Sequence, residues 1–199
     1  MIRFSLAVRA CCVCLLLLSA ACAPYALVPA APTSVANFTV DVDRPWNRIN
    51  QSNLRSNAPL GYWTADGPGL NTMLFVGGVK DGEEIISISN TGTSDRVAFR
   101  SNMTPSEILE LWESVLSQIT GSAVIRSSNL QPARFLNADG FRFDLQYAGG
   151  DEVERIGLGY AAVNAGRLYL IFYSGTKLHH YGLRLDSARR IIETARLGA

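Results

Sequence analysis

The chain has 199 residues, of which 48% are hydrophobic, and its 18 basic and 17 acidic residues give a net charge of +1. This length and composition are typical of one globular domain with an adequate hydrophobic core. The near-neutral charge argues against a nucleic-acid-binding protein, because such proteins need a basic surface. All four cysteines lie within the first 22 residues, so the rest of the chain has no thiol for a disulfide, a zinc site or a nucleophile.

The first 21 residues have the pattern of a secretion signal. Arg3 and Arg9 provide a basic start, and an uncharged run follows from residue 10 to residue 23. That run is too short to cross a bilayer, which takes roughly 20 apolar residues, but it suits the hydrophobic part of a cleavable signal peptide. We therefore expect residues 1–21 to be removed on export.

Small residues lead directly into Cys22, and this arrangement resembles the lipobox of bacterial lipoproteins. In that family the signal is cut before the cysteine, whose thiol carries diacylglycerol and whose amino group is acylated. The resemblance implies a lipid anchor at Cys22 in the bacterial cell envelope, and Ala23 favours the outer membrane, facing the periplasm. Ser19 stands where the family usually has leucine, so an ordinary signal peptide with an incidental cysteine is the alternative.

Residues 22–36 are rich in alanine and proline and carry no charge. Proline stiffens such a segment toward an extended form of about 3 Å per residue. We therefore expect this segment to be a tether that holds a single domain, residues 37–199, away from the lipid. A disordered leader is the simpler alternative and is compatible with the tether.

The start of the globular part contains several predicted strands. Residues 38–42 alternate between apolar and polar side chains, as in a half-buried strand, and residues 60–64 form a further candidate. Residues 72–79 and 84–88 are two apolar runs on either side of Asp81-Gly82. Because both turn residues tolerate positive φ, this spacing predicts a β-hairpin.

The clearest helix is predicted to begin at the segment Thr104-Pro105-Ser106-Glu107. Threonine can cap a helix, proline suits the first helical position, and Glu107 completes a capping box. An apolar stripe then recurs at three- and four-residue steps as far as Gly121, formed by Ile108, Leu111, Trp112, Val115 and Ile119.

A meander of three strands is predicted at residues 141–147, 152–163 and 167–173. The last of these is apolar on both faces, which suggests a central strand covered on both sides. A second helix closes the chain, with an apolar stripe of Leu185, Ala188, Ile191, Ile192 and Ala195. Together these patterns predict an α+β fold, in which an antiparallel sheet built from hairpins and a C-terminal meander is covered by two amphipathic helices.

This order of elements resembles the PsbP-like α/β/α sandwich, an architecture that recurs among bacterial lipoproteins of unknown function. Residues 43–49 (DRPWNRI) and residues 63–71 (WTADGPGLN) also resemble that uncharacterised lipoprotein family. The resemblance covers most of the chain after the signal peptide. It implies a fold and carries no catalytic residues across.

The sequence offers few residues for catalysis or metal binding. His179 and His180 are the only histidines, and because sequence neighbours point in different directions, the two cannot readily share a metal ion. Ser174, Asp144 and one histidine would form a hydrolase triad only if the fold brought them together. We predict no catalytic residue, no metal and no cofactor.

Gly157 and Gly159 share one face of a predicted strand, beside the strand that carries Tyr169 and Tyr173. Small residues leave room next to the backbone, so these four residues form a candidate groove for an apolar ligand. The alternative is that a helix packs into this space. Which faces the tyrosines and glycines share depends on the register set by the loop at residues 164–166.

Three hypotheses for function follow. The leading one is a non-catalytic accessory or interaction module of the envelope, anchored in the membrane at Cys22 and contacting an envelope protein. The second is a protein that binds a small apolar molecule or lipid in the groove between helix and sheet. The third is a periplasmic hydrolase, which needs Ser, His and Asp within hydrogen-bonding reach.

Overall fold

The computed structural model describes residues 25–50, 54–88 and 97–198. The predicted signal peptide, Cys22 and the first residues of the expected tether lie outside this part. Within the described residues, neither helix is both long enough and apolar enough to span a bilayer.

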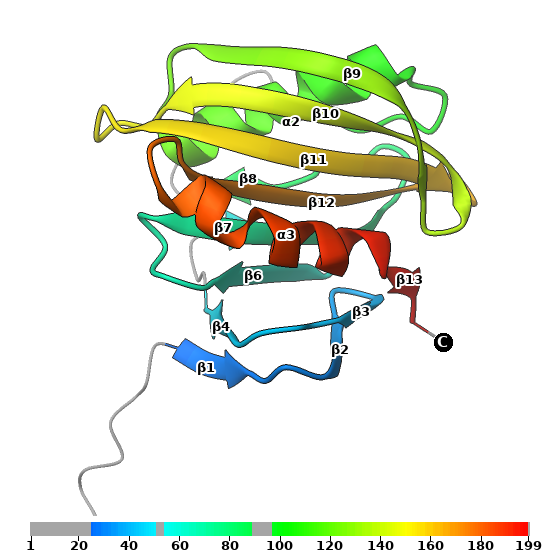
Figure 1. The fold of residues 1–199 in the computed structure, drawn as a ribbon. Coiled ribbons are helices and arrows are strands. Elements are labelled where there is room, and N and C mark those ends of the chain that lie inside the picture. The colour runs from blue at the N-terminus through cyan, green and yellow to red at the C-terminus, as the bar shows by residue number, and fades with distance from the viewer. Residues whose placement is uncertain (1–24, 51–53, 89–96, 199) are drawn as a thin grey trace, which may run out of the picture.

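A large antiparallel sheet of eight strands forms the body of the molecule, in the order β1-β4-β6-β7-β12-β11-β10-β9 (Figure 1). The strands are β1 (Tyr25–Val28), β4 (Trp46–Ile49), β6 (Leu60–Thr64), β7 (Asn71–Val79), β12 (Arg167–Thr176), β11 (Glu154–Asn164), β10 (Ala138–Ala148) and β9 (Ile125–Phe135). All neighbouring pairs are antiparallel. The predicted α+β class and the C-terminal meander, β10-β11-β12, are confirmed.

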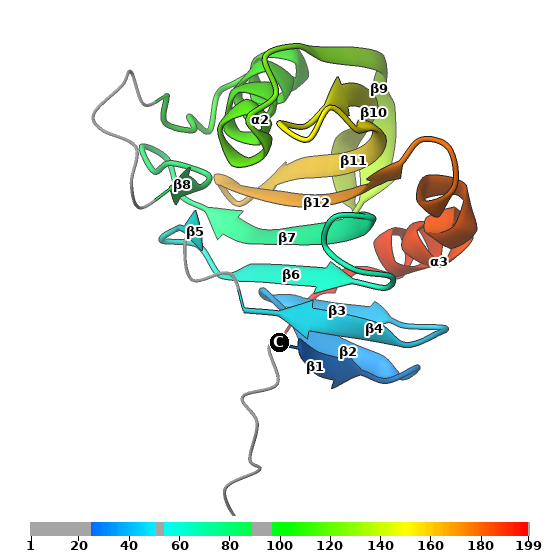
Figure 2. The ribbon, with the colours of Figure 1, turned by 90° about the vertical axis from the view of Figure 1, so that its left-hand side faces the viewer.

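Two helices, α2 (Pro105–Thr120) and α3 (His180–Glu193), lie on opposite sides of this sheet (Figure 2). A second sheet of three strands adds to the α3 side, in the order β13 (Arg196–Leu197), β3 (Phe38–Asp41) and β2 (Pro32–Val35). The short strands β5 (Leu54–Arg55) and β8 (Ser87–Ile88) form a separate pair. The result is a sandwich with the large sheet in its middle.

Helix α2 forms as the local signals predict. Thr104 accepts a hydrogen bond from the Glu107 backbone, the Glu107 carboxylate accepts one from the Thr104 backbone at 2.7 Å, and Gly121 ends the helix with a φ of 68°. The buried stripe of α2 packs on aromatic side chains of the meander, with Trp112 edge-on to Phe172. Burial of this apolar area is the main source of stability on this face.

The other face of the sheet has its own core. Trp46 and Trp63 are fully buried there, together with Phe38 of the second sheet and Ile191 of α3. Central strand β12 therefore faces apolar side chains on both sides, as its sequence predicts.

The predicted hairpin at Asp81-Gly82 is wrong. Strand β7 already has two neighbours, β6 and β12, so no edge of it is left for residues 84–88. Instead Ile85 and Ile86 enter the core on the α2 side, and Ser87–Ile88 pairs with Leu54–Arg55.

The expected tether also differs from the structure. Tyr25–Val28 pairs with Trp46–Ile49 at the edge of the large sheet, and Pro32–Val35 pairs with Phe38–Asp41. Val28 and Val35 are buried, because hydrophobic residues within an alanine- and proline-rich segment can still complete a core. The globular domain therefore begins well before residue 37.

Candidate functional site

Polar side chains gather at one end of the large sheet, on the face that α2 covers. Thr72 of β7 lies opposite Ser174 of β12, and their hydroxyl oxygens are 3.0 Å apart. Tyr147 of β10 donates a hydrogen bond to Ser174 at 3.0 Å, and Tyr62 of β6 lines the same pocket as Thr72. Four hydroxyl groups from four strands therefore gather in one row.

This hydroxyl row lines a pocket of about 350 Å³. Ile119 and Thr120 of α2 form one wall, and the β10–β11 loop at Gly149-Gly150 forms another. Arg155 stands at the rim with a side chain that is only 13% exposed.

Arg155 is already held by its neighbours. Its two terminal nitrogens contact the Asp151 carboxylate at 2.8 and 2.7 Å, and one of them also donates to the carbonyl oxygen of Gly69 at 3.0 Å. Bidentate pairs of this kind fix the guanidinium plane. Arg155 therefore ties the β10–β11 loop to the β6–β7 loop and shapes the pocket.

The hydroxyls of this pocket suit binding better than proton transfer. Burial raises the pKa of Tyr62 to about 12 and also raises the pKa of Tyr147. Both phenols are therefore neutral at physiological pH, and each can donate or accept a hydrogen bond. The pocket has the chemistry to hold a small polar molecule.

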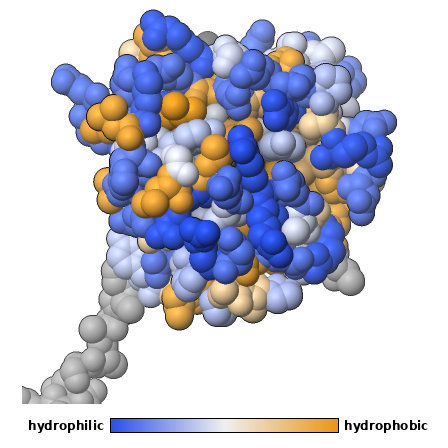
Figure 3. Space-filling view, viewed as in Figure 1, coloured by the Kyte–Doolittle hydropathy of each residue, from blue (hydrophilic) through white to orange (hydrophobic). Residues whose placement is uncertain are grey.

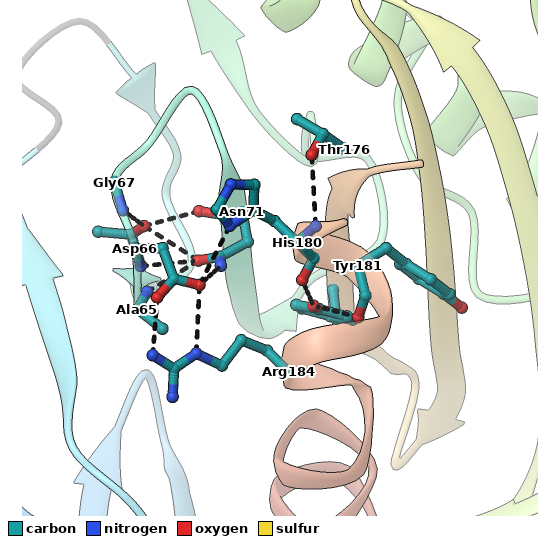
Figure 4. A network of polar contacts seen from close by, with 10 residues as sticks. Ala65, Asp66, Gly67, Asn71, Thr176, His180, Tyr181 and Arg184 are labelled. Carbon is teal, nitrogen blue, oxygen red and sulfur yellow. Dashed lines mark hydrogen bonds and ion pairs between the residues drawn. The ribbon is translucent and has the colours of Figure 1, made fainter. Parts of the chain in front are cut away.

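A second polar cluster lies on the opposite face, where the β6–β7 loop meets the start of α3 (Figure 4). Asp66 accepts hydrogen bonds from Arg184 at 2.7 and 3.2 Å and one from Asn71. The Nδ1 atom of His180 lies 3.5 Å from the same carboxylate. The hydrogen bond from Arg184 holds the pKa of Asp66 below its ordinary value.

This cluster fixes one helix to one loop. Asn71 is buried and accepts a hydrogen bond from the backbone of Ala65 at 2.8 Å, which holds the loop shape. The Tyr173 hydroxyl lies 3.0 and 2.8 Å from the carbonyl oxygens of His180 and Tyr181, in the first turn of α3. The hydrogen bonds of Arg184, Asn71 and Tyr173 serve the helix–loop contact, whereas the buried Nδ1 atom of His180 makes no hydrogen bond in the described part of the chain.

The histidines do not meet the serine of the notional triad. His179 precedes α3 and His180 is its first residue. Ser174 bonds to Thr72 and Tyr147, whereas Asp144 bonds to Asn129. Within residues 25–50, 54–88 and 97–198, no group of three or more His, Cys, Asp or Glu residues could hold a metal ion.

The predicted groove of Gly157, Gly159, Tyr169 and Tyr173 is wrong. In the observed register Gly157 lies opposite Ser174 and Gly159 opposite Phe172, whereas Tyr173 lies opposite Leu158. The glycines therefore face α2, and both tyrosines face α3.

Aromatic rings fill the space above both glycines. A Cβ atom at Gly157 would lie 2.2 Å from the Phe172 ring, and one at Gly159 would lie 2.1 Å from the Phe143 ring. Glycine is needed here so that the rings can lie on the backbone. The space is therefore filled by side chains of the sheet itself, and not by a helix as the alternative had it.

Sequence reasoning missed the hydroxyl row of Tyr62, Thr72, Tyr147 and Ser174. Ser174 was considered only as a member of the notional triad. The other three residues follow no regular spacing in the sequence that would group them. Their common feature is a position near the same end of four strands, which only the register reveals.

No protein-family model matches the chain, and no curated protein matches it significantly by sequence. The structure is similar to the solution structure of cyanobacterial PsbP (CyanoP) from Synechocystis sp. PCC 6803, with a TM-score of 0.51 and 10% sequence identity over 90% of this chain and 95% of that one. At this identity the likeness shows the fold alone, and it confirms the predicted PsbP-like sandwich.

A weaker similarity is to the crystal structure of LpqN, involved in cell envelope biogenesis of Mycobacterium tuberculosis. Its TM-score is 0.41 at 13% identity, over 88% of this chain and 92% of that one.

Proposed function

We propose that this protein is a lipid-anchored bacterial envelope lipoprotein that acts as a non-catalytic interaction module. The observation that carries the proposal is the run of small residues that ends in Cys22 after a short uncharged segment. A signal of this form, followed by one domain, directs the domain to a membrane surface outside the cytoplasm. By the same resemblance, Ala23 after the cysteine favours the outer membrane.

The side chains of the described domain support a non-catalytic role. Asp66 and Arg184 hold each other, and the phenols of Tyr62 and Tyr147 have raised pKa values. A general base needs a pKa near the working pH and a free position next to a substrate. Asp66 and Arg184 are engaged in holding a loop to α3, and the neutral phenols are far from the pKa that a general base needs.

The anchor is tested by metabolic labelling with a fatty-acid probe. Wild-type protein should take up the probe and fractionate with outer membranes, and Cys22→Ser should lose both properties. Ser19→Leu, which restores the usual lipobox residue, is a matched control that should label at least as well as the wild type. Undiminished labelling of Cys22→Ser would overturn the anchor.

The interaction role is tested by chemical crosslinking in intact envelopes followed by mass spectrometry. A defined envelope protein should be crosslinked reproducibly to the wild type and much less to the unanchored Cys22→Ser variant. Crosslinks that only follow protein abundance would contradict the interaction role. Turnover of an ester or glycoside substrate by the purified protein would contradict the non-catalytic role.

A second candidate function is the binding of a small polar molecule in the pocket of the hydroxyl row. The pocket volume of about 350 Å³ and its four neutral hydroxyls favour it. A thermal-shift screen of sugars, amino acids and nucleosides should then give a hit that Ser174→Ala weakens at least several-fold. Thr33→Ala, which removes a hydroxyl far from the pocket, should leave that hit unchanged.

A further inference from the structure

We propose that the β1 edge of the large sheet rests directly on the lipid surface, with Tyr25 and Leu27 in the membrane interface. This inference depends on lipidation of Cys22, and it names the surface that the anchored domain turns toward the membrane. It replaces the expectation that residues 22–36 hold the domain at a distance.

The length of chain between anchor and domain carries the argument. Only Ala23 and Pro24 separate Cys22 from Tyr25, the first residue of β1. Three residue steps span at most about 11 Å even when fully extended, at roughly 3.6 Å each. The headgroup layer on one side of a bilayer is itself about 5–8 Å thick. The start of β1 therefore cannot leave the neighbourhood of the headgroups.

The side chains at this edge have the chemistry of a membrane interface. Tyr25 is 44% exposed and Leu27 is 70% exposed, and residues two apart on a strand share one face. Tyr25 also lies opposite Ile49 of β4, which adds a third apolar side chain on that face. Tyrosine prefers the headgroup level because its ring is apolar and its hydroxyl is polar.

Among the described residues, the outer side of β1 pairs with no other strand of the large sheet. Helix α2 lies over the far end of the sheet, near β9 and β10, and β1 is the last strand at the opposite end (Figure 2). A pocket of about 570 Å³ opens beside the edge and is lined in part by Ala26 and Ile49. An exposed apolar edge strand invites association, and the short link to Cys22 makes the bilayer the nearest partner.

Positive charge at the same edge fits a lipid surface. Arg48 of β4 lies opposite Ala26, on the other face of this edge from Tyr25 and Leu27, and it is exposed. Basic residues beside a membrane are attracted to anionic lipids by about 1 kcal/mol each. By contrast, the α3 side of the molecule is mainly hydrophilic, with hydrophobic residues in scattered patches (Figure 3).

A site-specific fluorophore tests the proposal. After processing, Cys22 is the sole cysteine and its thiol carries lipid, so Leu27→Cys introduces one free thiol into the mature protein. We would label it with a polarity-sensitive dye and reconstitute the lipidated protein in vesicles of phosphatidylethanolamine and phosphatidylglycerol. The matched control is Leu178→Cys, because Leu178 is 97% exposed in the loop between β12 and α3. Strand β12, after which this loop begins, lies four strand spacings, about 19 Å, from β1.

The expected result is a blue-shifted emission at position 27, with at least two-fold quenching by headgroup-labelled lipid, and no change at position 178. Equal, water-like emission at both positions in protein that floats with the vesicles would overturn the proposal while leaving the anchor intact. Protein that fails to float would overturn the anchor and the proposal together. The same dye on an unanchored Cys22→Ser, Leu27→Cys variant should report water, and a blue shift there without vesicles would mean that a second copy covers the edge instead.

Discussion

Helices α2 and α3 cover opposite faces of one sheet, yet they are held in different ways. Helix α2 starts with a complete capping box and a proline, and ends at a glycine in the left-handed conformation. Helix α3 starts after His179, whose side chain makes no capping hydrogen bond. Its first turn is instead held by Arg184 on Asp66 and by the Tyr173 hydroxyl.

The difference separates local from tertiary control of helix position. Four consecutive residues determine where α2 starts. The start of α3 instead depends on contacts with a loop more than 100 residues earlier in the chain. The ends of α3 should therefore respond to remote substitutions, and those of α2 to substitutions within the helix.

The largest effect is expected for Trp112→Ala. Trp112 is fully buried on the sheet side of α2, and its ring centroid lies 5.4 Å from that of Phe172. Truncating such a side chain leaves a cavity and should lower the free energy of unfolding by about 3–5 kcal/mol, measured by urea denaturation with circular dichroism. Gln118→Ala, on the exposed side of the same helix, should stay within about 0.5 kcal/mol. A loss for Trp112→Ala as small as that of the control would refute the packing argument.

Arg184→Gln should come next. It removes the charge from a half-buried pair, in which the side chains of Arg184 and Asp66 are 23% and 17% exposed. Loss of hydrogen bonds between charged groups should cost about 1.5–3 kcal/mol, and amide hydrogen exchange should rise in the first turn of α3 but not in α2. The matched control is Arg134→Gln, because Arg134 and Asp139 are 71% and 96% exposed and such pairs contribute about 0–1 kcal/mol. Equal losses for the two variants would contradict the role of the ion pair.

The same pair should give the protein part of its acid sensitivity. The pKa of Asp66 is lowered in the folded state, mainly by Arg184, so its stabilising effect is complete above the ordinary aspartate pKa. It is lost as pH falls through the lower folded value. Unfolding free energies measured from neutral pH down to about pH 2 should fall less steeply for Asp66→Asn than for wild type. Parallel curves for the two proteins would be inconsistent with this assignment.

The smallest expected effects compare the two helix starts directly. Thr104→Ala removes the cap of α2 and should cost about 1 kcal/mol, whereas Thr104→Ser should retain most of it. His179→Ala removes a side chain that caps nothing and should change stability by less than about 0.5 kcal/mol. If His179→Ala cost as much as Thr104→Ala, the contrast between local and tertiary control would fail.

The elements that could be predicted from sequence are those with local signals. The capping residues of α2 act within one turn, and the alternation at residues 141–147 reports one buried face of β10. The prediction of a hairpin at Asp81-Gly82 was wrong because a good turn sequence does not guarantee that the preceding strand, β7, has an unpaired edge. The tether failed because composition alone does not show that Val28 and Val35 complete a core.

The prediction of a groove was wrong because the register between β11 and β12 decides which face of the sheet each side chain occupies. Ala165 and Gly166, with φ values of 49° and 72°, form a two-residue turn, which is the geometry of a tight hairpin. That turn places Gly157 opposite Ser174, and one residue more or less would have placed it with the tyrosines. The hydroxyl row depends on the same parity across four strands, so no spacing in the sequence could reveal it.

The second sheet joins an early and a late segment of the described chain. Strand β13 pairs with β3 through Arg196 and Thr39, and the backbone of Asp41 donates a hydrogen bond to Thr194 at 3.0 Å. A nascent chain that still lacks residue 196 therefore cannot finish the layer on which α3 rests.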